Sequence, residues 1–400
     1  MPVTDAVLSF ILAAALAWLL VPVTESIARR LGAIDLPNPR GLHDQPTPRL
    51  SGLAILVAVL AAGLIWLPWN GETRAILGGA ILITGVGALD DIYDLPAPVK
   101  LAGQTAAVLI PVLSGIRVED TTIPFVGQFT LGWVSYPLTV IGVVAVINMI
   151  NFADGVDGLA SGVCVISGIA FAIIALSLDR DAAGVLAALT AGAALGFLRH
   201  GFPPASSFMG DTGSNLLGYL LGMIAVQGAL KTNAVIALLF PLFVLAVPIL
   251  DTTFVVAKRI RYRKPVYLAD RWHFHHRMAN IGFSQRRTLA YLYGWTLIFA
   301  GLALALRFIP YHRHGHTYPG WLALVIACGV LALAASVYLV YVLEILKLRR
   351  VRFDQLRGLR TAAGRPTPPP EEIDAGVATE LETGSFPAVD PETGEFESVK

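Results

Sequence analysis

The sequence predicts an all-α polytopic membrane protein with about eleven transmembrane helices, an outer N-terminus and a cytoplasmic C-terminus. Of its 400 residues, 55% are hydrophobic and 14% are charged, whereas a soluble domain carries about 25% charged residues. The apolar residues gather into runs of membrane-spanning length, and the basic residues gather in alternate loops. The net charge of +1 provides no field that would attract a nucleic acid, so we expect no nucleic-acid partner.

Each span needs about 20 mostly apolar residues to cross the hydrocarbon core. Counting such runs predicts spans at residues 6–28, 51–68, 74–90, 99–116, 133–148, 162–178, 182–198, 214–230, 233–257, 288–308 and 319–346. The first run follows Asp5 without a basic segment or a clear cleavage site, so we interpret it as an anchor and not a removable signal. Weak alternation of apolar residues over 117–132 suggests a small β-hairpin on the outer side.

The distribution of lysine and arginine predicts the orientation. With the N-terminus outside, most of the 29 basic residues fall in cytoplasmic segments, and the outer side keeps Arg74, Arg117, Arg180, Lys231, Arg307 and Arg313. Residues 1–346 would then form the transmembrane domain. Residues 347–400 are basic, then proline-rich, then acidic, and this composition predicts a disordered cytoplasmic tail.

The polar motifs all fall at the cytoplasmic ends of the predicted spans. They are the segments 90–94 (DDIYD), 148–162 (NMINFADGVDGLASG), 208–215 (FMGDTGSN) and 258–287. In the second motif Asp154 and Asp157 are three residues apart, so on a helical turn both carboxylates would project from one face. A helix cap followed by a solvated turn would also explain that motif by itself. Because the motifs share one side of the membrane, we predict a single cytoplasmic active site assembled from several loops.

The carboxylates of these motifs predict a site for a hard divalent cation. Oxygen ligands come from Asp90, Asp91, Asp154, Asp157 and Asp211, and the motifs contain no cysteine. Oxygen ligands favour Mg²⁺ or Mn²⁺ over Zn²⁺. Because Mg²⁺ usually binds one or two carboxylates together with substrate phosphates, we expect the remaining carboxylates to handle a proton or a phosphate.

The run 270–277 (DRWHFHHR) predicts an anion site, because it holds three histidines and two arginines within eight residues. Arginine binds phosphate through paired hydrogen bonds, and histidine can donate or carry a proton. A zinc site made of histidines is the alternative, but no H-E-x-x-H motif accompanies the run. A cation and anion-binding groups at a membrane boundary together predict transfer of a phosphate-linked group to an acceptor dissolved in the bilayer.

Five motifs in a common order carry a resemblance to a known family. They are Asp35-x-Pro-Asn-x-Arg40-x-x-His43 with Pro48-Arg49, Asp90-Asp91-Ile-Tyr-Asp94 followed by Lys100-Leu-Ala-Gly-Gln104, Asn151-Phe-Ala-Asp154-Gly-Val-Asp157, Phe208-Met-Gly-Asp211-Thr-Gly-Ser, and the run 270–277. From about Asp35 to Arg287 the chain resembles the polyprenyl-phosphate N-acetylhexosamine-1-phosphate transferases of glycosyltransferase family four.

Within this family the chain is most similar to the bacterial undecaprenyl-phosphate N-acetylglucosamine-1-phosphate transferases. Phe274 interrupts the histidines and Arg277 follows them. The alternative, the phospho-N-acetylmuramoyl-pentapeptide transferases of peptidoglycan synthesis, usually has three consecutive histidines followed by Phe-Glu.

The resemblance implies an eleven-helix protein of the bacterial plasma (inner) membrane. It implies Mg²⁺-dependent transfer of N-acetylglucosamine 1-phosphate from UDP-N-acetylglucosamine to undecaprenyl phosphate, which releases UMP and starts a lipid-linked cell-wall or surface polysaccharide. Metal binding is implied for Asp211 and Asp91. Catalytic roles are implied for Asp90, Asp91, Asp154, Asp157, His273, His275 and His276. Substrate contacts are implied for Lys100, Asn151, Phe208, Arg271 and Arg277.

Two other functions compete with this interpretation. A transporter would place its binding groups near the bilayer midplane in paired repeats, and the sequence shows no convincing internal repeat. A lipid-phosphate hydrolase would differ only in using water as the acceptor. The sequence leaves open whether the protein acts as a homodimer, which aspartate is the base, and whether transfer passes through a covalent intermediate.

Overall fold

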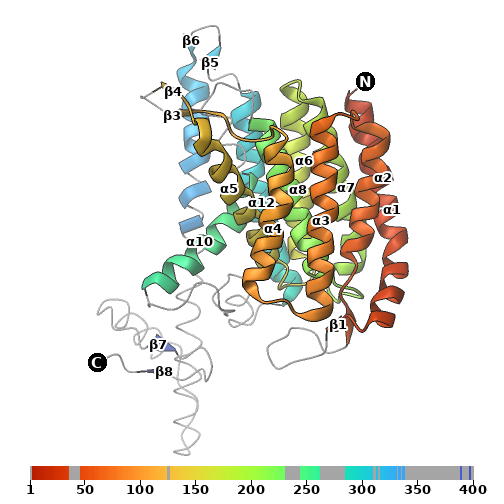
Figure 1. The fold of residues 1–400 in the computed structure, drawn as a ribbon. Helices are drawn as coiled ribbons and strands as arrows, with labels where there is room; N and C mark the ends of the chain where they lie inside the picture. Colours follow the sequence, from red (N-terminus) through yellow and green to blue (C-terminus); the bar gives the residue numbers. More distant parts are fainter. Residues whose placement is uncertain are drawn as a thin grey trace, which may run out of the picture. The chain divides into compact units, whose positions relative to one another are not determined.

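The computed structural model describes residues 2–35, 46–123, 127–229, 244–261, 284–309, 312–313, 316–330, 332–334, 336–337, 388–389 and 396–397. Its helices are α1 (Pro2–Leu31), α2 (Gly52–Trp66), α3 (Gly71–Tyr93), α4 (Ala97–Leu113), α5 (Ser135–Ala153), α6 (Leu159–Ser177), α7 (Asp181–Gly201), α8 (Gly210–Ala229), α10 (Ala246–Arg261) and α12 (Gln285–Phe308). Figure 1 shows α1 to α8 running alongside one another. The chain divides into two compact units, and the site described below lies in the first, Met1–Thr252 with Leu289–Val325.

Within the described residues, six helical segments are long and apolar enough to cross a membrane. They are Pro2–Leu31, Gly71–Tyr93, Gly132–Ala153, Leu159–Ser177, Asp181–Gly201 and Gln285–Phe308. Shorter apolar helices cover Gly52–Trp66, Ala97–Leu113 and Pro319–Ala334. The prediction of an all-α, multi-pass membrane protein is therefore confirmed. The count of eleven spans and the orientation stay predictions. Of the predicted span 233–257, residues 233–243 lie outside the described residues, and α10 begins at Ala246.

Burial separates the inner helices from the outer ones. Over the 18 most apolar consecutive residues of each helix, 78% of α7 and 72% of α6 is buried, whereas only 28% of α1 is buried. Apolar side chains that remain exposed on α1, such as Ile11 and Leu19, are those that lipid would cover. Helices α6 and α7 therefore lie in the interior of the bundle, and α1 lies nearer its surface.

The connection between α3 and α4 is short because both helix ends are encoded locally. Asp94 adopts a left-handed conformation (φ 53°), and its N–H donates to the Asp90 carbonyl at 2.8 Å, which closes α3. Pro96 precedes α4 with an extended backbone and cannot continue a helix from α3. The turn therefore brings the last turn of α3 beside the first turn of α4.

Short antiparallel strand pairs complete the fold. β3 (Asp120–Ile123) pairs with β4 (Gly127–Thr130), which confirms the β-hairpin predicted within 117–132. The other pairs are β1 (Ile34–Asp35) with β2 (Thr47–Pro48), β5 (His312–Arg313) with β6 (His316–Thr317), and β7 (Ala388–Val389) with β8 (Phe396–Glu397). β7 and β8 fall in the predicted tail 347–400, the rest of which lies outside the described residues.

Candidate active site

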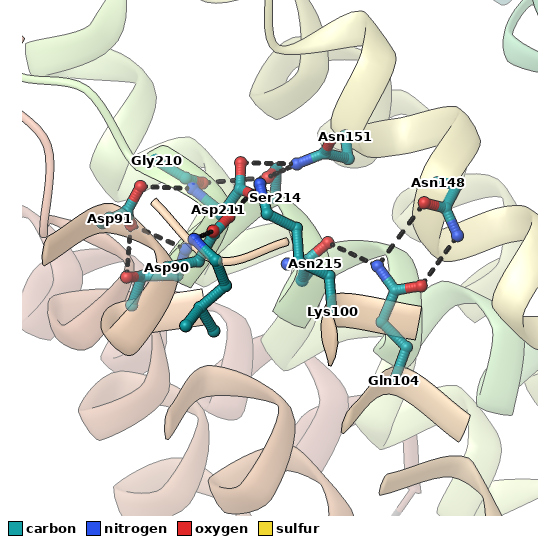
Figure 2. Close-up of polar contacts among 12 residues, drawn as sticks. Asp90, Asp91, Lys100, Gln104, Asn148, Asn151, Gly210, Asp211, Ser214 and Asn215 are labelled. Carbon is teal, nitrogen blue, oxygen red and sulfur yellow. Dashed lines mark hydrogen bonds and ion pairs between the residues drawn. The ribbon is translucent and has the colours of Figure 1, made fainter. Parts of the chain in front are cut away.

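Lys100 lies between two carboxylates at one end of the helix bundle (Figure 2). Its Nζ atom is 2.5 Å from Asp90 Oδ2 and 3.4 Å from Asp211 Oδ2. Asp90 belongs to the last turn of α3, Lys100 to the first turn of α4 and Asp211 to the first turn of α8, so three helix ends meet here. The Asp90 side chain is 4% exposed, and Lys100 supplies the counter-charge that such a buried carboxylate requires.

Helix α5 holds the other side of the Asp211 carboxylate through Asn151. Asn151 Nδ2 donates to Asp211 Oδ1 at 2.8 Å and to Ser214 Oγ at 2.9 Å. Ser214 Oγ in turn donates to the Gly210 carbonyl at 2.9 Å. One oxygen of Asp211 therefore faces Lys100 and the other faces Asn151. Ser214 was not among the predicted site residues, although its place one turn after Gly210 in FMGDTGS was a signal that could have identified it.

Asp91 caps helix α8 from a different helix. Its Oδ1 accepts the Asp211 N–H at 3.0 Å, and its Oδ2 accepts the Thr212 N–H at 2.9 Å and the Thr212 hydroxyl at 2.6 Å. These are the unpaired N–H groups of a helix start, where a carboxylate is also favoured by the helix dipole. Gly210 has φ +65°, and a Cβ there would lie 2.3 Å from Asp91 Oδ2 and from the Arg49 carbonyl. Glycine is therefore required for α8 to begin against Asp91.

The predicted pair Asp154 and Asp157 lies in the turn between α5 and α6. Asp157 Oδ2 accepts the Ala205 N–H at 3.3 Å and so links this turn to the segment before the FMGDTGS motif. Asp154 is partly buried. Burial raises the pKa of Asp154 well above its ordinary value, and the negative charges of Asp211, Asp91 and Asp157 raise it further.

Helix α12 contacts the same turn through Tyr293. The Tyr293 hydroxyl donates to the Gly158 carbonyl at 2.5 Å. A Cβ at Gly162 would lie 2.2 Å from the ring of Tyr293, so glycine permits this approach. Tyr293 was not predicted from the sequence, because nothing in its apolar run indicates a contact with a turn so distant along the chain.

Phe208 is positioned by its backbone. Its N–H donates to the Pro48 carbonyl at 2.8 Å, and its carbonyl accepts the Ser51 N–H at 3.3 Å. The side chain of Phe208 is partly exposed, as a group that contacts a ligand must be. Its implied contact with the substrate stays a prediction.

The structure thus brings together residues from four of the predicted motifs. The predicted residues of the fifth motif lie outside the described residues: Arg271, His273, His275, His276 and Arg277. The same holds for Arg40 and His43 in the first motif.

The oxygen-rich character of the site fits a hard divalent cation. Within the described part of the chain, no group of three or more His, Cys, Asp and Glu side chains is arranged to hold a metal ion. However, Lys100 Nζ already lies between oxygens of Asp90 and Asp211, so a positive charge is accommodated between these carboxylates. Proteins usually bind Mg²⁺ through one or two carboxylates, and substrate phosphates supply further ligands.

The site residues fall inside a region that matches a known family. The family model described as glycosyl transferase family 4 matches residues 73–229, which contain Asp90, Lys100, Asn151 and Asp211.

Three named relatives match most of the chain. A Bacillus subtilis (strain 168) protein named "Probable undecaprenyl-phosphate N-acetylglucosaminyl 1-phosphate transferase" is 38% identical over 75% of this chain and 85% of its own length. The decaprenyl-phosphate N-acetylglucosaminephosphotransferase of Mycolicibacterium smegmatis is 37% identical over 71% of this chain and 78% of its own length. The undecaprenyl-phosphate alpha-N-acetylglucosaminyl 1-phosphate transferase of Escherichia coli (strain K12) is 27% identical over 75% of this chain and 82% of its own length.

Proposed function

Because this chain belongs to glycosyl transferase family 4, we propose that it transfers N-acetylglucosamine 1-phosphate from UDP-N-acetylglucosamine to a polyprenyl phosphate such as undecaprenyl phosphate, releasing UMP. The names of the three relatives support an N-acetylglucosamine donor over the muramoyl-pentapeptide alternative. The observation that carries the proposal is the convergence of Asp90, Lys100, Asn151 and Asp211 from four helix ends. Groups gathered at helix ends favour a site at the membrane boundary over a transport site at the midplane.

In the net reaction, the bond between the sugar-linked phosphorus of the donor and the oxygen of the leaving uridylate breaks. A bond from that phosphorus to a phosphate oxygen of the lipid forms. Lys100 is placed to bind a phosphate oxygen, because its side chain is 32% exposed and its position is held by the buried Asp90. Asp154, whose pKa is raised, is suited to accept a proton from the lipid phosphate.

The divalent cation, Mg²⁺ or Mn²⁺, would be held by Asp211 with Asp90 beside it. When bound, such a cation screens the charge of the diphosphate and stabilises charge on the leaving phosphate. The metal role predicted for Asp91 would require its oxygens to give up hydrogen bonds from Asp211 and Thr212. We therefore assign to Asp91 the task of holding Asp211 in place.

We place the reaction on the cytoplasmic face of the bacterial plasma membrane, where the water-soluble donor would meet the lipid acceptor. The predicted arrangement of eleven spans with an outer N-terminus would put every polar motif on that face. The histidines and arginines of 270–277 would bind the diphosphate of the donor there.

The test is a donor screen with purified full-length protein, Mg²⁺ and undecaprenyl phosphate. UDP-N-acetylglucosamine should yield equal amounts of UMP and lipid-diphosphate sugar, whereas UDP-N-acetylmuramoyl-pentapeptide should yield neither. EDTA should stop the reaction, and Mg²⁺ or Mn²⁺ should restore it. Phosphate release without a lipid-linked sugar would indicate a hydrolase, and no product from any UDP-sugar would reject the proposal.

A further inference from the structure

A layer of three amide side chains lies one helical turn away from the charged site (Figure 2). Each amide is three or four residues from one site residue and therefore on the same helix face. The pairs are Gln104 with Lys100 on α4, Asn148 with Asn151 on α5, and Asn215 with Asp211 on α8. The hydrogen bonds within this amide layer, Gln104–Asn148–Asn215, join side chains of three different helices.

Gln104 is the centre of the amide layer. Its Nε2 is 3.5 Å from Asn148 Oδ1 and 3.4 Å from Asn215 Oδ1, and its Oε1 accepts from Asn148 Nδ2 at 2.8 Å. Gln104 is 4% exposed and Asn215 is 3% exposed. Buried amides that lose their partners cost free energy, so these bonds resist displacement of the helices that carry them.

A backbone carbonyl fixes the direction of all of these bonds. Asn148 Nδ2 also donates to the Val144 carbonyl at 2.8 Å, and a carbonyl can only accept. The nitrogen of Asn148 must therefore face Val144 and Gln104 Oε1, which leaves Gln104 Nε2 to face the oxygen of Asn215. Sliding α4 by one residue would break every hydrogen bond that Gln104 makes to Asn148 and Asn215.

The amide layer connects helices that bear different parts of the site. α4 and α8 each pack against α3 and α5. The hydrogen bond from Gln104 to Asn215 joins α4 directly to α8, as does the ion pair of Lys100 with Asp211 one turn away. The two contacts therefore join the same pair of helices, one helical turn apart.

We propose that Gln104, Asn148 and Asn215 are positioning residues that set the spacing of Lys100, Asn151 and Asp211. The proposal rests on the proposed function, in which Lys100 binds a phosphate oxygen and Asp211, oriented by Asn151, holds the cation. A displacement of about 1 Å in such a site lowers turnover by about 100-fold. The amide layer would then control turnover more strongly than substrate affinity.

The first test is kinetic. Gln104→Met, which keeps the length of the side chain and removes its hydrogen bonds, should lower kcat by about 10- to 100-fold and change the KM for UDP-N-acetylglucosamine by less than about twofold. Asn215→Leu should act in the same way. The double variant should be no slower than the slower single variant, because both changes break one network. Independent, multiplying effects would overturn the proposal.

The second test does not use activity. Spin labels on cysteines at Val99 and Phe152, exposed neighbours of Lys100 and Asn151, report the distance between α4 and α5 once Cys164 and Cys328 are replaced by alanine. Gln104→Met should broaden or shift this distance. An unchanged distance would overturn the proposal. If the wild-type protein releases no UMP, the proposed function fails, and the spin-label distance still decides whether the amides position the helices.

Thr139→Val provides the matched control. Thr139 Oγ1 accepts the Val118 N–H at 3.0 Å near the opposite end of α5, so the variant also removes a hydrogen bond between segments. It should lower the unfolding temperature while leaving kcat and the spin-label distance unchanged. A loss of kcat in Gln104→Met no larger than that in Thr139→Val would mean that the amides have only a structural role.

Discussion

The carboxylate of Asp91 on α3 accepts two hydrogen bonds from Thr212 on α8, one from its N–H at 2.9 Å and one from its hydroxyl at 2.6 Å. Asp91 and Thr212 are 121 positions apart in the chain. A third bond, from the Asp211 N–H, comes from the residue that faces Lys100. The cap of α8 and the orientation of the Asp211 carboxylate are therefore one structural feature.

Thr212→Val should destabilise the protein, because it leaves the buried Asp91 oxygen with one donor fewer. A hydrogen bond to a charged group contributes about 1.5–3 kcal/mol, so we expect a loss of that size in the free energy of unfolding. UMP release should fall as well, since Asp211 loses part of its support. Thermal unfolding in detergent and UMP release measure the two effects. Thr212→Ser keeps the hydroxyl and should match the wild type; equal stability of the Val and Ser variants would contradict the role of the bond.

Lys100→Met should reduce both stability and activity. Removing one partner of a buried ion pair costs about 3–5 kcal/mol, and the cost here should be smaller because Lys100 is 32% exposed. UMP release should fall by about 100-fold or more, because a positive charge at the phosphates is lost.

A second substitution separates the two roles of Lys100. Lys100→Met combined with Asp90→Asn should recover much of the lost stability, because the more buried of the two carboxylates no longer lacks its counter-charge, and Asp211 keeps its hydrogen bond from Asn151. It should not recover activity. Recovery of UMP release in this double variant would show that Lys100 serves only to neutralise Asp90.

Asp154→Asn should stabilise the protein at alkaline pH and inactivate it. The folded state raises the pKa of Asp154 above its ordinary value of 3.8, so the folded protein holds this proton more tightly than the unfolded chain does. Asp154 therefore costs stability as the pH rises from about 3.8 through the raised pKa, and asparagine removes that cost. Melting temperatures at pH 8 and pH 5 should show a larger advantage for Asn at pH 8. UMP release should fall by about 100- to 10,000-fold. A variant less stable at pH 8 than the wild type would contradict the assigned direction of the pKa shift.

Tyr293→Phe should loosen the turn that carries Asp154 and Asp157. The lost hydrogen bond to the Gly158 carbonyl should lower the free energy of unfolding by about 0.5–1.5 kcal/mol. UMP release should fall several-fold, since the turn bears two site carboxylates. Tyr318, which is 46% exposed, provides the control: Tyr318→Phe should change neither quantity. Equal effects of the two substitutions would argue against a specific link between α12 and the turn.

Much of the fold could be predicted because it is encoded by local chemistry. Apolar runs must become helices in a bilayer, since their backbone groups have no other hydrogen-bond partners there. The β-hairpin within 117–132 was likewise predicted from alternation and is present. The site was predictable to the extent that its members sit at helix ends. The pairing of Asp90 with Lys100 follows from a short turn ended by Asp94 and Pro96.

By itself, the sequence determined the class of protein, its helices and the group of polar residues from which a phosphate-transfer site is built. Only the tertiary structure decided how those residues divide their tasks. Asp90 and Asp91 are neighbours in the chain, but successive residues of a helix point in different directions. Asp90 therefore meets Lys100 while Asp91 meets the start of α8. The link from Asn151 to Asp211 depends likewise on how α5 packs against α8, and packing of distant helices leaves no mark in a local pattern of residues.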